Sequence, residues 1–510
     1  MKVLVTGGTG VVGRGAVTAL LARGHTVRLF SRHAGEDVRQ WDAGVEPWPG
    51  DIAERGDVDG CTAGCEAVVH IVGIVDESPP ELTFDRVNVE GTRLMVREAE
   101  RGGVRRFVYV SSLGAQEGDS PYHRSKARGE ALASEFAGDW VIVRPSNVYG
   151  PGDEVISLLL KMVRTLPAIP VIGDGEQTFQ PVWYEDVATA LAAAVERDDV
   201  VGRALDLAGT ERTTMNDLVD RLKRVTGRAP ARLPLPHGLA ALGLRLADMV
   251  GIDTPINESQ LTMLREGNVI ARDEDNALVT VFGVRPTPLD AGLERLADAL
   301  PEQLPSDGVG SLERKRFWAD VSGSRLGAHE LFARFRLRFA DLVPEGVGVG
   351  AEPGTPTGPL AEGQTLTLSL PLRGHCQVRV ADLTEVGMTL VTLDGHPLAG
   401  AVRFLAETRG DCVRFEVQTY DRAATLPDLV VMRTIGGRLQ DATWAELVER
   451  VVRESGGAAP DGVQRDRVTL DDERATRVND WLRELVLDQR ADEQTPTAAR
   501  DAAEQTRPHA

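Results

Sequence analysis

A tyrosine and a lysine stand four residues apart, at Tyr122 and Lys126 in the string YHRSK. If a helix begins near Ser120, both side chains lie on one helix face. The lysine ammonium would then stabilise a phenolate and lower the tyrosine pKa from about 10 toward neutrality. Such a tyrosine can pass a proton to or from a substrate oxygen. Ser112 follows an apolar run at 107–110, and its hydroxyl can bind the same oxygen. These residues are the predicted catalytic group.

Glycines dominate the loop after the first apolar run, in the string TGGTGVVG. Glycine permits the unusual dihedrals of a tight turn and lets the backbone approach a diphosphate. At Gly13 it also lets helix and strand pack closely. Free N–H groups at the start of the following helix would point at the phosphates. A strand before and a helix after the loop support a dinucleotide site. The predicted cofactor-binding residues here are Thr6, Gly7, Gly8, Thr9, Gly10, Val11, Val12 and Gly13.

The end of the second strand bears on which dinucleotide binds. An acidic residue there commonly holds the ribose 2′-hydroxyl, but this strand ends in Ser31 and Arg32. Arg32 can pair with a 2′-phosphate, and Arg14 after the last glycine also favours NADP over NAD. The alternative for Arg32 is a solvated arginine. Asp51 follows a Pro-Gly pair, where its carboxylate either accepts from the adenine amino group or closes a turn. Ser31, Arg32 and Asp51 are therefore also predicted to bind the cofactor, and Lys126 can in addition hold the nicotinamide ribose.

Alternating strands and helices must position these residues. Up to about residue 130, short apolar runs alternate with helical patterns, which predicts a parallel sheet with right-handed crossovers. We therefore expect an α/β Rossmann fold, a doubly wound parallel sheet with a small substrate lobe, over residues 1–300. Strands are predicted at 2–6, 25–30, 67–71, 106–110 and 140–144, and helices at 13–23 and 87–102.

The second half has a different pattern. Residues 301–312, rich in Pro, Gly and polar residues, predict a linker. Residues 313–343 read as helical or mixed. Consecutive strands closed by one helix predict an α+β domain over 313–455. Residues 456–510 are expected to be a charged tail, partly disordered, with one helix near 471–487. The strands are predicted at 365–370, 377–380, 388–393, 402–406 and 413–418, and the closing helix at 443–453.

Composition narrows the classes of function. The formal net charge is 57 − 77 = −20, which argues against a nucleic-acid binder because phosphate contacts need clustered Lys and Arg. Neither a signal peptide nor an apolar run of about 18 residues is recognisable, so we expect a cytoplasmic protein without stable membrane insertion. The cysteines lack zinc-site spacing, so no metal site is predicted. They are Cys61, Cys65, Cys376 and Cys412.

Five motifs occur in order: TGGTGVVG, NVEGT, FVYVSS, YHRSK and RPSNVYGPG. They resemble the extended short-chain dehydrogenase/reductase superfamily of the NAD-dependent epimerase/dehydratase type, over about residues 1–300. The resemblance is nearest to the atypical branch that includes the accessory Rossmann subunit of respiratory complex I. It implies that Asn88 lies near the proton relay and that Arg144 and Pro145 lie beside the nicotinamide. For the catalytic residues it implies Ser112, Tyr122 and Lys126.

Two more features refine the resemblance. Only nine residues separate Ser112 from Tyr122, fewer than in sugar-nucleotide epimerases, which disfavours a nucleotide-sugar substrate. The segment 364–455, with the string TLDGHPLAG, resembles an uncharacterised bacterial helix-grip domain related to START-type lipid-binding folds. In such folds a curved antiparallel sheet wraps around a long helix and leaves an apolar cavity between the two. His396 in this string could be a catalytic base, but we favour a structural turn histidine.

Three functions stay open from the sequence. The first is an NAD(P)-dependent oxidoreductase or epimerase acting on a hydroxyl or carbonyl of a small metabolite. The second is a cofactor-bound structural or regulatory protein without turnover. The third is a lipid-type ligand-binding protein that uses the second half. A homodimer is compatible with all three.

Overall fold

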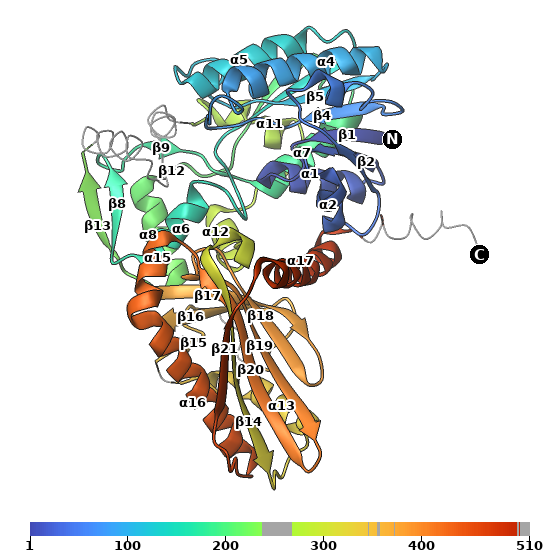
Figure 1. Cartoon of the computed structure of the whole chain (residues 1–510). Helices are drawn as coiled ribbons and strands as arrows, with labels where there is room; N and C mark the ends of the chain where they lie inside the picture. Colours follow the sequence, from blue (N-terminus) through green and yellow to red (C-terminus); the bar gives the residue numbers. More distant parts are fainter. Residues whose placement is uncertain (237–267, 345, 354–357, 372, 497–498, 500–510) are drawn as a thin grey trace, which may run out of the picture.

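The computed structural model describes residues 1–236, 268–344, 346–353, 358–371, 373–496 and 499 (Figure 1). The first half is built on seven parallel strands in the order β11-β6-β5-β4-β1-β2-β3. The strand order reverses between β1 and β4, the place where doubly wound sheets bind ligands. The expected Rossmann fold is confirmed. Its strands are β1 (Lys2–Thr6), β2 (Thr26–Ser31), β3 (Val45–Pro49), β4 (Ala67–His70), β5 (Arg106–Val110), β6 (Asp139–Pro145) and β11 (Arg203–Leu207).

Both faces of this sheet are covered by helices. In β1, Val3 and Val5 belong to one core and Leu4 to the other. Because both faces are buried, the strand reads as a continuous apolar run without alternation. Figure 1 shows α4 and α5 together on one side. The first core is covered by α1 (Val11–Ala22) and α7 (Tyr184–Glu196), and the second by α4 (Gly91–Arg101) and α5 (Pro121–Ser134).

A smaller lobe with its own apolar core follows the sheet. Three helices pack there, α6 (Ile156–Thr165), α8 (Met215–Thr226) and α12 (Leu289–Asp298). Short strands pair as β7–β10, β8–β13 and β9–β12. The shorter elements of the first half are β7 (Val148–Tyr149), β8 (Ala168–Ile172), β9 (Thr178–Phe179), β10 (Val182–Trp183), β12 (Thr213–Thr214), β13 (Ala231–Leu235), α2 (Ala34–Asp37), α3 (Arg55–Val58) and α11 (Ala277–Thr280).

The second half is an antiparallel sheet in the order β15-β16-β17-β18-β19-β20-β14-β21. Its mixture of strands and helices confirms the expected α+β class, while the helix-grip kinship stays a prediction. The strands are β14 (Val309–Ser322), β15 (Gly348–Val349), β16 (Thr365–Leu370), β17 (Gly374–Leu383), β18 (Gly387–Thr392), β19 (Leu398–Arg409), β20 (Cys412–Ala423) and β21 (Gln464–Thr469). The helices are α13 (Ala328–Leu337), α14 (Phe339–Leu342), α15 (Leu426–Val431), α16 (Gly437–Ser455) and α17 (Asp472–Gln494).

Aromatic side chains fill the space between this sheet and the helices α13, α14 and α16. Phe335 lies at the centre, with ring centroids of Phe404 at 5.1 Å and Phe415 at 4.9 Å. Phe332 and Phe339 pack against the same ring at 5.8 Å and 5.6 Å. This part of the interior is therefore a packed core, because close ring contacts leave no room for an acyl chain between them.

Two segments are more ordered than their composition predicts. Within 301–312, the Gln303 N–H donates to the Thr392 carbonyl at 2.7 Å, and β14 already begins at Val309. Residues 464–469, inside the expected charged tail, form β21, and the helix expected near 471–487 is present as α17, Asp472–Gln494. The domain boundaries themselves stay a prediction. The predicted disorder at the chain end falls largely on 497–498 and 500–510, outside the described residues.

Candidate active site

The glycine loop has a geometry that larger residues could not adopt. Gly7 has φ of +69°, a left-handed conformation that favours glycine. A Cβ on Gly13 would lie 2.0 Å from the Gly7 carbonyl oxygen, so the first turn of α1 packs directly on the loop. Gly10 caps α1 without a side-chain hydrogen bond, and a Cβ there would meet only the Gly7 oxygen, at 3.5 Å. The loop therefore packs closely on α1 at Gly13 but leaves free space at Gly10, beside the helix N-terminus. Binding of a phosphate there requires such space.

Thr6 ends β1 beneath this loop and turns inward. Its side chain is fully buried, and its hydroxyl lies 2.9 Å from Nδ1 of His70 and accepts from the Ile71 N–H at 3.2 Å. Thr6 therefore joins the end of β1 to the end of β4 by hydrogen bonds, and its contact with a cofactor stays a prediction. Sequence reasoning named Thr6 for the cofactor because neighbouring residues share a loop, whereas the side-chain direction depends on the strand pairing.

The predicted adenosine-side residues are each engaged in local contacts. The Ser31 hydroxyl donates to the Asp37 carboxylate. Asp51 accepts from the Ala53 N–H at 2.9 Å, the contact of a turn aspartate. Arg32 is exposed and forms no ion pair with a described residue. Arg14, expected near the phosphates, instead donates to the Pro151 carbonyl at 2.8 Å.

The predicted catalytic side chains meet at the carboxyl end of β5. Ser120 caps α5 and accepts from the His123 N–H at 3.1 Å, so Tyr122 and Lys126 stand on the first two turns of that helix. Tyr122 is hydrogen-bonded to Ser112. The structure thus brings the serine and the tyrosine into direct contact.

The acidities of this group differ from the sequence-based expectation. Desolvation raises the pKa of Tyr122 to about 12, against a smaller lowering by Ser112, so the predicted fall toward neutrality is wrong for this state. Burial lowers the pKa of Lys126 to about 8. The Lys126 ammonium lies 4.9 Å from the centroid of the Tyr109 ring. The pKa of Tyr122 is therefore decided by the loss of water around the phenol, and Lys126 is not among the groups that shift it.

Asn88 connects the loop after β4 to helix α5. It lies in the π-helical turn η2 (Asp85–Glu90), which opens the helix predicted at 87–102. Its amide accepts from the Ile74 N–H at 2.8 Å and donates to the Ser125 hydroxyl at 2.9 Å. A Cβ on Gly73 would lie 3.2 Å from the Lys126 nitrogen and 3.4 Å from the Asn88 oxygen. The amide and the ammonium thus lie on the same side of the site.

A buried histidine, His70, connects the end of β1 to helix α4, and it was not among the predicted site residues. The side chain of His70 bridges Thr6 and the Thr92 hydroxyl, the latter at 3.1 Å. Burial, with a smaller contribution from Lys126, lowers the pKa of His70 to about 3, so the ring is neutral. The available signal was a histidine at the end of an otherwise apolar strand.

The predicted nicotinamide-side residues take part in fixed contacts. Arg144 binds the buried Glu130 carboxylate through two hydrogen bonds, of 2.8 Å and 2.6 Å. The Pro145 carbonyl accepts from the Leu113 N–H at 3.0 Å. The arginine charge is therefore balanced by α5, and the pair fixes β6 to the helix that carries Tyr122.

Comparison with known proteins adds family membership. The model of the NAD dependent epimerase/dehydratase family matches residues 3–208. Ceramide reductase of Caulobacter vibrioides is 32% identical over 237 residues, which is 46% of this chain and 73% of that protein. Sterol demethylase protein B of Methylococcus capsulatus is 32% identical over 262 residues, 47% of this chain and 79% of that protein. The chain belongs to the NAD dependent epimerase/dehydratase family. All predicted site residues fall inside the matched segment.

Other similar proteins share less sequence with this chain. NADH dehydrogenase [ubiquinone] 1 alpha subcomplex subunit 9 of Arabidopsis thaliana is 28% identical over 287 residues, 54% of this chain and 71% of that protein. Among solved structures, MoeE5 in complex with UDP-glucose and NAD is similar with a TM-score of 0.46 and 23% identity, covering 58% of this chain and 97% of that one.

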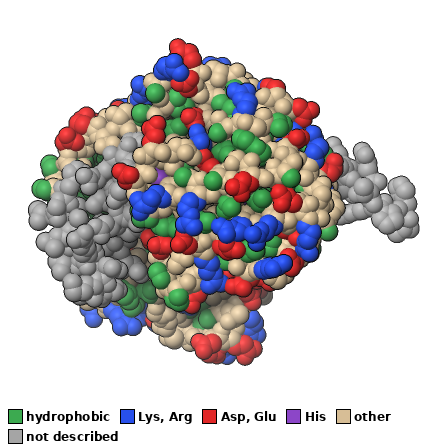
Figure 2. All heavy atoms as spheres, turned by 90° about the horizontal axis from the view of Figure 1, so that it is seen from above, with side chains coloured by type: hydrophobic (Ala, Val, Ile, Leu, Met, Phe, Trp, Pro, Cys, Tyr) green, Lys and Arg blue, Asp and Glu red, His purple; other side chains and the backbone are tan. Residues whose placement is uncertain are grey.

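The described residues were also compared with the features of membrane-spanning, metal-binding and nucleic-acid-binding proteins. Within them, no helix combines the length and apolarity needed to cross a membrane, and no group of three or more His, Cys, Asp or Glu side chains could hold a metal ion. Figure 2 shows acidic and basic side chains interspersed on the face seen from the α4–α5 side. That face has no continuous basic stripe of the kind that follows a nucleic-acid backbone.

Proposed function

We propose that the protein is an NADP-dependent oxidoreductase that reduces a carbonyl group, or oxidises the matching hydroxyl, of a small metabolite. The observation that carries the proposal is the hydrogen bond between Tyr122 and Ser112. This pair lies at the carboxyl end of β5, on the edge of the sheet that also bears the glycine loop. A proton donor and a dinucleotide site then face one another across the strand-order reversal.

The glycine loop fits a dinucleotide. Its outer side is open at Gly10, whereas a methyl group on Gly13 would overlap the Gly7 oxygen. The N–H groups of the first turn of α1 would hold the diphosphate, and the buried Lys126 would hold a ribose hydroxyl. A bound nicotinamide would supply or accept the hydride.

The protein's own residues would handle the proton. Ser112 and Tyr122 would hold the substrate oxygen between them, and in reduction the Tyr122 O–H bond breaks as the proton moves to that oxygen. The pKa of about 12 keeps Tyr122 protonated at neutral pH, as an acid requires. Lys126, below its pKa of about 8, would stabilise the phenolate that remains.

Opposite charges at the end of β2 bear on the choice between NADP and NAD. The exposed Arg32 favours a 2′-phosphate, while the Asp37 carboxylate at the Ser31 hydroxyl favours a 2′-hydroxyl. We keep NADP as the proposed cofactor because Asp37 is already engaged by Ser31. Thermal unfolding with each dinucleotide ranks them, since a ligand stabilises the state it binds. A larger shift with NAD would overturn this preference.

The proposed substrate is a carbonyl compound with an apolar part. Support comes from relatives named for such reductions, ceramide reductase and the 2-alkyl-3-oxoalkanoate reductase of Stenotrophomonas maltophilia, the latter 28% identical over 253 residues. The segment between Ser112 and Tyr122 is short, so it contributes less surface to a pocket for a nucleotide-sugar. Screening 3-oxo acids and long-chain ketones would test this class.

Turnover is tested by following NADPH absorbance with the full chain and that substrate panel. Tyr122→Phe should lower kcat by about 10²-fold or more, because it removes the proton donor. Tyr149→Phe is the matched control, since the Tyr149 hydroxyl is buried without a hydrogen-bond partner among the described residues and lies outside the proposed group. Equal rates for wild type and Tyr122→Phe would reject Tyr122 as the acid.

A cofactor-bound structural role is the second candidate, favoured by the resemblance to the complex I subunit. Binding of dinucleotide without turnover on any substrate would support it. The third function, a lipid-type ligand between the second sheet and its helices, is weakened by the phenylalanine core around Phe335.

A further inference from the structure

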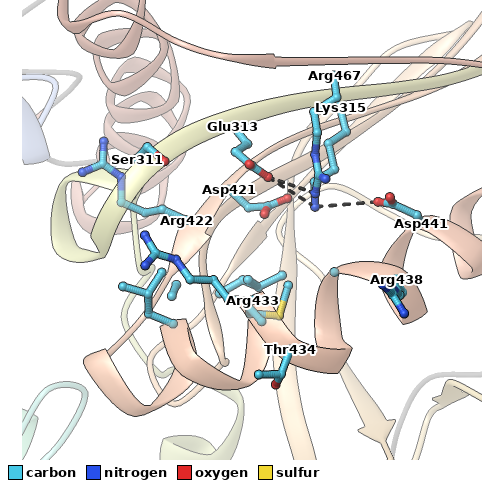
Figure 3. A pocket seen from close by; sticks show the side chains of 15 residues that line it. Ser311, Glu313, Lys315, Asp421, Arg422, Arg433, Thr434, Arg438, Asp441 and Arg467 are labelled. Carbon is cyan, nitrogen blue, oxygen red and sulfur yellow. Dashed lines mark ion pairs between the residues drawn. The ribbon is translucent and has the colours of Figure 1, made fainter.

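A cavity of about 380 Å³ lies in the second half, far along the chain from the glycine loop. Figure 3 shows it between the strands β14 and β20 and the segment that joins α15 to α16. Lys315 and Asp421 line it from the sheet, and Arg433 and Arg438 from the helical side. None of the predicted catalytic or cofactor residues borders it, so it would be a separate site.

The floor of the cavity is a buried polar network. The Lys315 side chain is only 3% exposed, and its ammonium lies 3.7 Å from Glu313 and 3.8 Å from Asp441. It also donates to Gln440, whose amide in turn donates to Asp421 at 3.1 Å. Burial raises the pKa of Asp421. One oxygen of Asp441 is buried and accepts no hydrogen bond from a described residue. The floor therefore offers both a donor and an acceptor to a polar ligand.

The rim of the cavity gathers cations that lack partners. Arg422, Arg433 and Arg438 line the cavity, and none of them forms an ion pair within the described part of the chain. The Nε of Arg422 is in addition buried without a hydrogen bond. Arg467, by contrast, is paired with Glu313 at 3.1 Å. In a chain of net charge −20, three guanidinium groups without an ion pair among the described residues line this cavity, Arg422 and Arg433 on one side and Arg438 on the other (Figure 3), and together they favour an anion there.

Apolar side chains are exposed on the same helical segment. They are Leu426 (68% exposed), Val430 (64%), Val431 (57%) and Leu439 (49%). Water contact of several large apolar groups beside arginines is typical of surfaces that bind amphiphiles. The anion could then be attached to an apolar group that lies over these side chains.

We propose that this cavity binds a phosphate monoester, with Arg422, Arg433 and Arg438 neutralising its charge. Phosphate fits better than carboxylate because a monoester carries nearly two charges and three acceptor oxygens, and guanidinium groups pair with it in a bidentate manner. The same chemistry occurs in a free metabolite and in the headgroup of a lipid such as phosphatidic acid. The polar floor and rim exclude a purely apolar ligand from the cavity itself.

The test titrates the full chain with glycerol 3-phosphate by calorimetry, with NAD⁺ in excess, because its diphosphate can occupy the glycine loop while it carries no phosphate monoester. A second arm measures sedimentation with phosphatidylcholine vesicles with and without phosphatidic acid. Arg433→Gln/Arg438→Gln should weaken binding by about tenfold or more, because two charge-assisted contacts are lost. Arg453→Gln is the matched control, an exposed arginine at the other end of α16 without an ion pair among the described residues.

The two experiments also distinguish a free phosphate monoester from the headgroup of a lipid. Binding of glycerol 3-phosphate alone supports a soluble ligand, and binding only to vesicles with phosphatidic acid supports a lipid headgroup. In the second case Val430→Ser should weaken vesicle binding further. The proposal is overturned if neither probe binds, or if the double variant binds as tightly as Arg453→Gln. Arg422→Gln gives an independent check, because it removes the rim residue on the sheet side.

Discussion

The Thr6 hydroxyl and Nδ1 of His70 lie 2.9 Å apart at the carboxyl ends of adjacent strands. Through this contact the strand that leads into the glycine loop is hydrogen-bonded to the strand that leads toward Asn88. The other ring nitrogen of His70 reaches Thr92 in α4. The proposed cofactor loop and the proposed proton relay therefore share one buried support.

Replacing His70 should destabilise the fold. His70→Leu leaves the Thr6 and Thr92 hydroxyls without their shared partner, at a cost of about 2–4 kcal/mol in the free energy of unfolding. Urea unfolding measures this cost. His329→Gln is the control, because the His329 side chain is 62% exposed and should change stability by less than about 0.5 kcal/mol. If the His70→Leu protein were as stable as the control, His70 would not stabilise the fold through Thr6 and Thr92.

Acid should weaken the protein through the same histidine. The ordinary pKa of 6.5 falls to about 3 in the folded state, so the unfolded chain takes up the proton first. The His70 contribution is complete above pH 6.5 and is lost as the pH falls from 6.5 toward 3, by about 1.4 kcal/mol per pH unit. Unfolding free energies at pH 7.5 and 5.5 should therefore differ more in wild type than in His70→Leu. Equal differences would exclude His70 as the cause.

Single methyl groups on the glycine loop should separate folding from binding. Gly13→Ala places a Cβ 2.0 Å from the Gly7 oxygen, so both stability and dinucleotide affinity should fall. Gly10→Ala meets only one atom, at 3.5 Å, so the fold should persist while affinity drops at least about tenfold. Calorimetry with NADP⁺ and thermal unfolding measure the two effects. Gly35→Ala, with open space around it, should change neither quantity, and intact binding in Gly10→Ala would contradict the loop's role.

Ion pairs of different burial link α6 to the second half. Arg164 and Glu352 are 2.6 Å apart with side chains 3% and 6% exposed. Arg164→Met should cost about 3–5 kcal/mol, because the buried Glu352 carboxylate loses its arginine, while the contacts that it keeps with His375 and Thr367 are longer, both at 3.4 Å. Lys161 and Asp394, 2.8 Å apart but with side chains 27% and 36% exposed, provide the comparison. Lys161→Met should cost less than about 1 kcal/mol, and urea unfolding that gave equal costs would contradict this reading.

Local patterns predicted much of this molecule. The glycine loop, the strands of the parallel sheet and the Tyr122–Lys126 spacing depend on neighbours in sequence, so the sequence analysis could find them. β14 also carried a signal, since the buried apolar residues Phe317, Ala319 and Val321 recur at every second position, yet the region was expected to be helical or mixed. β21 (QRDRVT) has almost no apolar alternation, and its pairing with β14 could not be predicted from its composition.

Long-range contacts account for what the sequence analysis missed. The Arg144–Glu130 pair joins a strand to a helix, so neither residue alone indicates that the arginine charge is balanced. The pKa of Tyr122 depends on how many atoms exclude water around it, which a spacing of four residues does not report. His70 became recognisable only once β1 and β4 were paired.

Helix α17 has a consequence for how the chain is made. Its side chains reach the first half through Glu484 to Arg39 and Arg483 to Glu36, and the Gln494 carbonyl accepts from the Thr18 hydroxyl. On a ribosome the strands of the parallel sheet are made long before α17, so the surface around Thr18, Glu36 and Arg39 stays uncovered until residues 472–494 have been made. During that interval the nascent chain exposes a surface that α17 will later cover, and a stop codon before α17 would leave it exposed permanently.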